Sequence, residues 1–310
     1  MTLTELRYIV ALARERHFGR AADSCHVSQP TLSVGVKKLE DELGVVLFER
    51  SKTDISLTPV GERIVEQAQR ALDEAGVIKE LAQGAQDELA GPLRLGAIYT
   101  IGPYLFPHLI PLLHERLPQM PLVIEENYTA RLGEKLKQGE LDAILIALPF
   151  AEAGIVTQAL YEEPFVVVLP ASHPWTAREQ IDAADLGTED ETLLMLGAGH
   201  CFRDQVLEAC PACRHGSREL QKNLEGGSLE TIRHMVASGM GITVLPCSAA
   251  GADRYSQRLL SIRRFAPPAP SRTVALAWRR HFPRPRALSA LAEAVRDCDL
   301  SCVTPVIDSN

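Results

Sequence analysis

The chain has 310 residues, of which 46% are hydrophobic and 23% charged, as in ordinary folded proteins and unlike disordered ones. Its formal net charge of −8 argues against a general binder of polyanions, since such proteins are usually basic. Residues 95–114 form the longest uncharged run, but Gly102, Pro107 and Pro111 interrupt it, so no membrane span is expected there. Residues 1–7 show no basic start that leads into an apolar core, which predicts a cytoplasmic protein.

The negative charge is unevenly distributed along the chain. Residues 1–60 carry eight Lys and Arg against eight Asp and Glu, so the whole −8 lies in residues 61–310. A neutral N-terminal head on an acidic body remains compatible with specific DNA binding. The seven cysteines are expected to be mostly reduced in a protein that is not secreted. Four of them are interpreted as small buried or incidental residues: Cys25, Cys247, Cys298 and Cys302.

Residues 1–44 have the periodicity of three short helices. Apolar residues at helical spacing occupy residues 3–13, and small side chains in residues 18–24 permit close packing. Ser28 is a good N-cap for the third helix, and Gly44 ends it. This order predicts a helix-turn-helix, although three small helices that pack on a partner protein would give the same pattern.

The outer side of the third helix offers short polar side chains and one cation, which suit base edges and phosphates in a DNA major groove. Two short runs, residues 45–49 and 55–57, flank a polar turn and predict a hairpin wing that presents Arg50 to the DNA backbone or minor groove. The candidate DNA-binding residues are Ser28, Gln29, Pro30, Thr31, Ser33, Lys37 and Arg50.

A long helix is predicted to follow the wing. It starts at Pro59, carries an apolar stripe with no obvious domain to pack on, and ends through Gly84 and then Gly91. Such a helix favours a partner helix, and the same helix of a second subunit is the simplest one. The sequence therefore predicts a homodimer joined by this linker helix.

From Leu93 onward, strand-like and helix-like segments alternate, which is typical of a parallel α/β sheet. A second set of segments opens near Phe165, and the chain then returns to the first set, so we expect two lobes with a ligand cleft between them. The predicted domains are a DNA-binding domain over 1–58, a dimerisation helix over 59–91 and a regulatory domain over 92–310, with lobe I at about 92–162 and 268–300 and lobe II at about 163–267.

The stretch from Gly199 to Cys210 carries the most chemistry. A helix is predicted to begin at Cys201, where free amide groups, the helix dipole, His200 and Arg203 would favour the nucleophilic thiolate. Cys210 lies nine residues further on, so an intact helix would hold the two Cα atoms roughly 13 Å apart. A disulfide needs less than about 7 Å. If the two cysteines pair, the helix between them has to unfold.

Other interpretations of this stretch compete. The two cysteines can be inert residues at the ends of a helix. Zinc would suit His200, Cys201, Cys210, Cys213 and His215, although a second Cys-x-x-Cys motif is missing. A small organic anion between the lobes would leave the cysteines irrelevant and use Thr100 as a binding hydroxyl. A thiol peroxidase would use the same two cysteines, but it would not need the first ninety residues.

Several motifs resemble one family. Residues 18–24, 27–33, 38–40, 47–50 and 57–61 are similar to the winged helix of LysR-type transcriptional regulators. This resemblance implies DNA contacts by Thr31, Ser33 and Arg50. It also implies a fold in which a winged helix-turn-helix and a linker helix precede a two-lobed, periplasmic-binding-protein-like α/β domain.

Residues 199–205 with Cys210 resemble the redox signature of the hydrogen-peroxide-sensing branch of that family, and residues 102–105, 173–175 and 228–231 are similar to it as well. The resemblance implies that Cys201 attacks peroxide and that Cys210 resolves the sulfenic acid to a disulfide. Cys213 departs from the pattern, because it offers a rival resolving thiol. The residues implied around the peroxide are Thr100, Thr129, His200, Arg203, Asp204 and Arg272.

The predicted function is therefore peroxide sensing by a transcription regulator that controls antioxidant defence genes and is not an enzyme. Its expected partners are double-stranded promoter DNA, hydrogen peroxide, a second subunit in a homodimer, a second such dimer in a tetramer, and RNA polymerase. No cofactor, metal or membrane is expected. A LysR-type regulator that responds to a small organic effector remains the alternative.

Overall fold

The computed structural model describes residues 1–50, 55–84, 87–187, 192–210, 226–251, 258–300 and 302–306. They form two compact units, Met1–Gln86 and Asp87–Asn310. Within these described ranges, no helix is both long and apolar enough to cross a lipid bilayer.

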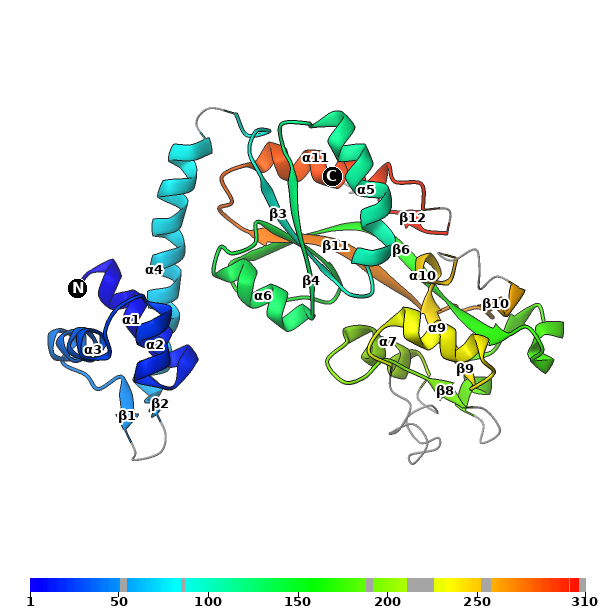
Figure 1. Ribbon diagram of the computed structural model, residues 1–310, viewed down its shortest axis with the longest axis horizontal. Coiled ribbons are helices and arrows are strands. Elements are labelled where there is room, and N and C mark those ends of the chain that lie inside the picture. Colours follow the sequence, from blue (N-terminus) through cyan, green and yellow to red (C-terminus); the bar gives the residue numbers. More distant parts are fainter. Residues whose placement is uncertain are drawn as a thin grey trace. The chain divides into compact units, whose positions relative to one another are not determined.

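The first unit is a small helical head followed by a long helix (Figure 1). Its elements are α1 (Leu3–Glu15), α2 (Phe18–Ser24), α3 (Gln29–Leu43), β1 (Phe48–Arg50), β2 (Ile55–Leu57) and α4 (Pro59–Gly84). The antiparallel pair β1–β2 is the predicted wing hairpin. Apolar faces of the helices, with Leu12, Leu32 and Leu39 fully buried, make one core.

Local capping explains where the head's helices begin and end. The Thr2 hydroxyl accepts the Glu5 N–H while the Glu5 carboxylate accepts the Thr2 N–H, a reciprocal capping box at the start of α1. The Ser28 hydroxyl accepts the Thr31 N–H at the start of α3, and Gly44, with φ of 68°, ends that helix. The predicted boundaries of the third helix are confirmed.

The wing is fixed to α4 by a close backbone contact. A Cβ at Gly61 would lie 2.1 Å from the carbonyl oxygen of Leu47, so only glycine fits there. The Thr58 hydroxyl donates to the Val46 carbonyl at 2.8 Å and accepts the Gly61 N–H at 2.9 Å. Sequence residues 58–61 thus join the hairpin and the long helix.

The second unit contains a mixed sheet with the strand order β4-β3-β5-β11-β6-β10-β7, and β8, β9 and β12 pair beside this path. The strands are β3 (Leu93–Ile98), β4 (Leu122–Asn127), β5 (Ala143–Ala147), β6 (Ile155–Pro170), β7 (Gln180–Ile181), β8 (Leu193–Leu194), β9 (Ile242–Pro246), β10 (Leu260–Phe265), β11 (Ser271–Arg279) and β12 (Thr304–Pro305). The helices are α5 (Gly102–Arg116), α6 (Thr129–Lys137), α7 (Cys201–Ala209), α9 (Leu229–Ala237), α10 (Cys247–Ala250) and α11 (Pro285–Arg296), with 3-10 turns η1 (Pro174–Ala177) and η2 (Ala183–Gly187).

Strand β6 connects two separate hydrophobic cores (Figure 1). Its first part pairs with β11, and its last part pairs with β9 and β10. The first core also takes α11 from the C-terminal part of the chain, whereas the second takes α7 and α9. The predicted α/β class with two lobes is confirmed.

The prediction of a parallel sheet is only partly right. Strand β3 pairs in parallel with β4 and β5. Strands β11, β6, β9 and β10 pair antiparallel where they meet, because the chain returns to the first lobe in the opposite direction. Alternating strands and helices predict a layered α/β fold, but they do not fix the direction of a strand that arrives from a distant part of the chain.

Candidate functional site

A small cavity lies where the ends of β3 and β4 meet the beginnings of α6 and α7. Its wall consists of Ile98, Tyr99, Thr100, Asn127, Tyr128, Thr129, Gly199, His200 and Cys201. The volume that the centre of a water-sized molecule can occupy in this cavity is about 10 Å³. This is close to the smallest volume that holds one water. The free thiol of Cys201 is half-buried at this wall. The cavity therefore admits a very small polar molecule beside a free thiol.

Two threonine hydroxyls give the cavity hydrogen-bonding capacity. Thr129 Oγ1 is buried and has no hydrogen-bond partner among the described residues, which is rare for a buried polar atom, so its hydroxyl can bond a molecule in the cavity. Thr100 is 2% exposed, and its hydroxyl oxygen accepts a bond of 2.8 Å from Arg272 Nη1. The Thr100 oxygen is thereby occupied as an acceptor, and its proton remains available to a molecule in the cavity.

Arg272 supports the cavity from behind Thr100. Its Nη2 donates to the Thr100 carbonyl oxygen at 2.8 Å, and its Nε donates to Glu163 Oε2 at 2.8 Å. Both charged side chains have 0% exposure. Its guanidinium carbon lies 5.4 Å from the centre of the Phe202 ring, within the range of a cation–π contact. Arg272 thus lies directly behind Thr100, and the Glu163 carboxylate balances its charge.

Cys201 is the first residue of α7, as predicted, and His200 is the N-cap. Helix α6 begins at Thr129, another cavity residue. The N-terminal end of a helix carries partial positive charge, which favours the binding of negatively charged groups. Two helices thus begin at the cavity wall, and one of them starts with Cys201.

His200 does not supply the positive charge that the sequence suggested. It is 6% exposed, and burial lowers the pKa of its imidazole below the ordinary value of 6.5. The neutral ring therefore predominates at neutral pH, where one ring nitrogen can donate a hydrogen bond and the other can accept one. Its ring centre lies 4.8 Å from that of Tyr128 and 6.0 Å from that of Tyr99, so two aromatic rings hold it in place.

The structure leaves two other predicted residues outside the cavity wall. Asp204 is exposed on the first turn of α7. Arg203 donates from Nη1 to the Leu196 carbonyl oxygen at 2.8 Å, which fixes the loop before α7. Cys210, at the other end of α7, is 2% exposed in the second core and is disulfide-bonded in this structure. Cys213 and His215 lie outside the described residues.

The sequence did not point to Tyr99, Asn127 or Tyr128, and it named Gly199 only as the start of the motif around Cys201. Tyr99 directly follows β3, and Tyr128 directly follows β4. The carboxyl ends of neighbouring parallel strands are the usual ligand site of an α/β sheet, and this rule would have indicated both. Gly199 has φ of +96°, and a Cβ there would meet the Tyr128 ring at 3.5 Å, so glycine sets the approach to α7.

Metal ligands do not gather in the described part of the chain, where no three His, Cys, Asp or Glu side chains are placed to hold an ion. Two of the five residues in the zinc hypothesis, Cys213 and His215, lie outside that part.

The interpretation of Cys247 and Cys302 as incidental residues is wrong. They form a disulfide with a Cα–Cα distance of 6.1 Å across a sequence separation of 55 residues. Cys25 and Cys298 are free thiols, both half-buried. No spacing motif links Cys247 with Cys302, so only the fold brings the two together.

The predicted DNA-binding residues lie at and after the start of α3. Ser28, Gln29, Pro30, Thr31 and Lys37 are exposed, and Ser33 is half-buried. The Ser28 and Thr31 hydroxyls lie 2.8 Å apart. The Arg50 side chain lies outside the described part of the structure. The head therefore presents polar groups on one helix end, as a major-groove reader requires.

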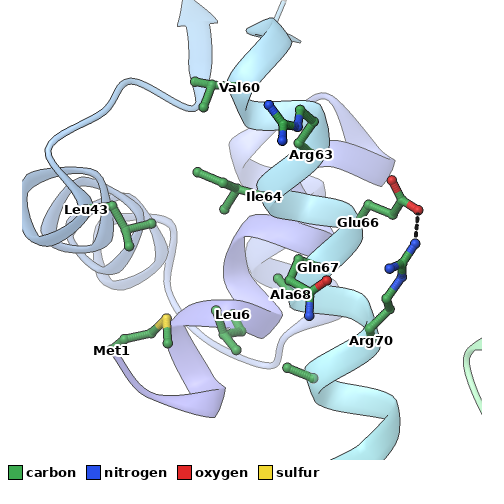
Figure 2. A pocket seen from close by; sticks show the side chains of 11 residues that line it. Met1, Leu6, Leu43, Val60, Arg63, Ile64, Glu66, Gln67, Ala68 and Arg70 are labelled. Carbon is green, nitrogen blue, oxygen red and sulfur yellow. Dashed lines mark hydrogen bonds and ion pairs between the residues drawn. The ribbon is translucent and has the colours of Figure 1, made fainter.

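A groove of about 730 Å³ runs between α4 and the head. Figure 2 shows Met1, Leu6, Leu43 and Ile64 around it, with Arg70 and Glu66 of α4 paired at its rim. Val60 and Leu43 are each 38% exposed. This apolar surface belongs to the helix that the sequence predicts as a dimer contact.

Two family models match the chain. The bacterial regulatory helix-turn-helix protein of the lysR family matches residues 3–62, and the LysR substrate binding domain matches residues 86–298. The chain is 42% identical to the DNA-binding transcriptional dual regulator OxyR of Escherichia coli K12 over 96% of its own length and 95% of that protein.

The chain is also similar to solved structures of OxyR proteins. A full-length OxyR variant from Pseudomonas aeruginosa is 62% identical, with a TM-score of 0.73 and 96% of each chain covered. A Corynebacterium glutamicum OxyR mutant with bound hydrogen peroxide is 32% identical, with a TM-score of 0.62, and the match covers 95% of this chain and 91% of that one.

Proposed function

Because the chain belongs to the LysR family of transcription regulators, and within it to the OxyR proteins, we propose that it senses hydrogen peroxide at Cys201 and controls transcription through its DNA-binding head. The named relatives are DNA-binding regulators of transcription and not enzymes. The protein accordingly acts as a stoichiometric signal: each molecule reacts once with hydrogen peroxide and is then reduced again.

One observation carries the assignment of the cavity: its wall combines a free thiol with room for only a water-sized molecule. Hydrogen peroxide has two oxygen atoms, and small movements of the wall would admit it. An organic effector of several carbon atoms would not fit this space. The cavity therefore supports hydrogen peroxide, and not a small organic effector, as the molecule that the protein senses.

The proposed chemistry starts from the Cys201 thiolate. Its sulfur attacks one peroxide oxygen and the O–O bond breaks, so that the thiolate becomes sulfenic acid and hydroxide leaves. The Thr129 hydroxyl, which lacks a protein partner, and the Thr100 hydroxyl hold the peroxide. The neutral His200 ring donates a hydrogen bond to the leaving oxygen, and the hydroxide takes its proton from water. Arg272, acting through Thr100, stabilises the developing negative charge.

The second step joins the two ends of α7. In the reduced protein, the Cys210 thiol condenses with the sulfenic acid of Cys201, and one water is released as the disulfide forms. Helix α7 separates the two residues by nine positions, about 13 Å along a helix. The disulfide therefore requires α7 to unfold, so oxidation changes the structure of lobe II. Arg203, which holds the loop before α7, and the exposed Asp204 change their surroundings in that step.

DNA binding is assigned to the head. Ser28, Gln29, Pro30, Thr31, Ser33 and Lys37 would read the major groove, and Arg50 would contact the backbone or minor groove. Residues 1–58 then form the DNA-binding domain, 59–91 the dimerisation helix and 92–310 the sensor. The apolar groove along α4 supports a homodimer. A tetramer that binds promoter DNA, activates RNA polymerase and controls antioxidant genes in the cytoplasm completes the proposal.

A peptide map tests the sensor. Reduced protein is treated with one equivalent of hydrogen peroxide, its free thiols are blocked, and its oxidised cysteines are identified by mass spectrometry. We expect Cys201 in the first oxidised species and a promoter response in transcription assays that Cys201→Ser abolishes and Cys298→Ser retains. If Cys201 appears in no oxidised species, the proposed function is wrong.

A further inference from the structure

The disulfide between Cys247 and Cys302 lies far from α7 in sequence and plays no part in the peroxide chemistry above. Cys247 begins α10 in the second lobe, whereas Cys302 lies on the C-terminal segment. Val303, next to Cys302, packs against both hydrophobic cores. The bond therefore ties the segment that bridges the two lobes to the second lobe.

We propose that Cys247 and Cys302 form a second, reversible redox site, closed by peroxide independently of Cys201 and opened by a dithiol reductant.

The exposure of the pair fits reversible chemistry. Cys302 is exposed, whereas Cys247 is 9% exposed. Both border an open cavity of about 590 Å³, so reagents reach the Cys302 sulfur from solvent. Exposed disulfides are the labile and regulatory ones, because thiol–disulfide exchange needs access to a sulfur atom.

The reduced state also has satisfactory contacts. The Cys247 sulfur lies 3.3 Å from the Cys302 carbonyl oxygen, so a Cys247 thiol can donate to that oxygen. The C-terminal segment is held beyond Cys302 by β12, in which Thr304 pairs with Glu162 and Pro305 with Tyr161. The two sulfurs therefore stay close after reduction and can pair again.

Hydrogen peroxide is the oxidant that closes the Cys247–Cys302 disulfide, and a dithiol is the reductant that opens it. The Cys302 thiolate attacks one peroxide oxygen to give sulfenic acid and hydroxide, which takes up a proton. The Cys247 thiol then condenses with the sulfenic acid to give the disulfide and water. In reduction, one thiolate of a dithiol attacks the Cys302 sulfur and the Cys247 thiolate leaves and is protonated. The second thiol of the reductant then releases Cys302.

A chain of buried hydrogen bonds leads from this pair to the peroxide cavity. Ser248, the residue after Cys247, donates its N–H to Glu163 Oε1 at 3.1 Å. The other oxygen of Glu163 accepts from Arg272, which donates to both oxygens of Thr100. Opening the disulfide releases Cys247, and with it the neighbouring Ser248 that donates to Glu163, while β12 keeps the C-terminal segment in place. The position of Thr100, and with it the reaction of Cys201, therefore depends on whether the pair is closed.

Thiol mapping on full-length Cys201→Ser protein tests the pair without relying on the proposed function. Reduced protein is treated with peroxide and then with a dithiol, and the free cysteines are alkylated at each stage. We expect Cys247 and Cys302 to be linked after peroxide and alkylated after the dithiol. If both thiols stay free in peroxide, or if the dithiol does not open the bond in folded protein, the second site is overturned.

Cys298 is the matched internal control. It is a free thiol four residues before Cys302, and burial, aided by the Asp297 carboxylate, raises its pKa to about 11. A thiol with a raised pKa holds little thiolate and reacts slowly. Its alkylation should be the same at every stage, and a loss equal to that of Cys302 would indicate unspecific oxidation and overturn the proposal.

The coupling rests on the proposed function and is tested by kinetics. Cys302→Ser replaces an exposed side chain, so it should fold normally, and Cys201 oxidation by peroxide is followed beside Cys298→Ser. We expect the Cys302→Ser rate to fall about fivefold, at the low end of coupling between two sites, and the Cys298→Ser rate to match the parent. A parental rate in Cys302→Ser overturns the coupling. Failure of Cys201 to react in every variant refutes the proposed function and leaves the mapping result intact.

Discussion

Arg272 and Glu163 form an ion pair in which neither side chain is exposed, with Nη2 2.7 Å from Oε2. The two residues come from the adjacent strands β11 and β6 and are directly opposite each other. Charges so deeply buried are costly unless they are paired and hydrogen-bonded. This pair is hydrogen-bonded further through Thr100 and Ser248, so it holds the cavity wall rigidly.

Glu163→Gln should be strongly destabilising, because it leaves the buried Arg272 cation without its counter-charge. We expect the free energy of unfolding, measured with urea, to fall by about 3 kcal/mol. Arg116→Gln is the matched control, since it breaks the exposed Arg116–Asp297 pair and should cost less than about 1 kcal/mol. Similar losses for the two variants would contradict a structural role for the buried pair.

Thr129→Val should slow the reaction of Cys201 with peroxide without loss of stability. The Thr129 hydroxyl has no partner among the described residues, so valine removes no internal hydrogen bond there. One hydrogen bond to the peroxide, worth roughly 1.4 kcal/mol in the transition state, corresponds to about a tenfold slower rate. Stopped-flow measurement of sulfenic acid formation checks this. Asp204→Ala, at an exposed position, serves for comparison, and an unchanged rate in Thr129→Val would exclude its hydroxyl from the site.

Oxidation should increase hydrogen exchange along α7. Since Cys201 and Cys210 cannot meet across an intact helix, the amides of residues 202–209 must lose protection when the disulfide forms. Cys210→Ser should still form sulfenic acid, which a trapping reagent detects, and should keep α7 protected. Identical exchange in reduced and oxidised protein would leave the disulfide without a route to the DNA-binding head.

Substitutions in the head should separate affinity from sequence preference. Arg50→Ala should weaken binding to all promoter sites alike, because backbone contacts carry no sequence information. Changes at Thr31 should alter which sites are preferred, because its exposed side chain is expected to face base edges. Footprinting on a panel of promoters decides between the two effects. Unchanged affinity in Arg50→Ala would remove the wing from the interface.

The acid stability of the head should depend on Lys38. Its ammonium group donates to Glu5 Oε1 at 2.7 Å, and this bond lowers the pKa of Glu5 from 4.5 to about 2. Ionised Glu5 therefore stabilises the fold above about pH 4.5, and this stabilisation is lost as the pH falls towards 2. Lys38→Met should shift acid unfolding, followed by circular dichroism, to higher pH. Lys37→Met, at the neighbouring exposed position, should not.

Local signals predicted much of this architecture. Ser28 and Gly44 mark the ends of α3, and the residues around Cys201 mark the start of α7, because caps act within a few residues of the helix end. Four of the predicted site residues, Thr100, Thr129, His200 and Cys201, do line one cavity.

Features that depend on distant residues were missed. The middle of β6 contains Glu162 and Glu163, and adjacent acids are unusual in a strand. Glu163 is tolerated because Arg272 lies opposite, 109 positions along the chain. Cys247 and Cys302 likewise meet only through the fold. The periodicity of apolar residues in the sequence does not predict such pairings.

The course of β6 between the two cores constrains how the chain folds during synthesis. The first lobe needs β11 and α11 to complete its sheet and core, and the ribosome delivers these only after all of the second lobe. Nascent chains that end before residue 279 expose the unpaired edge of β6 and of β5, and such edges invite aggregation. The head, whose contacts are local, can fold long before.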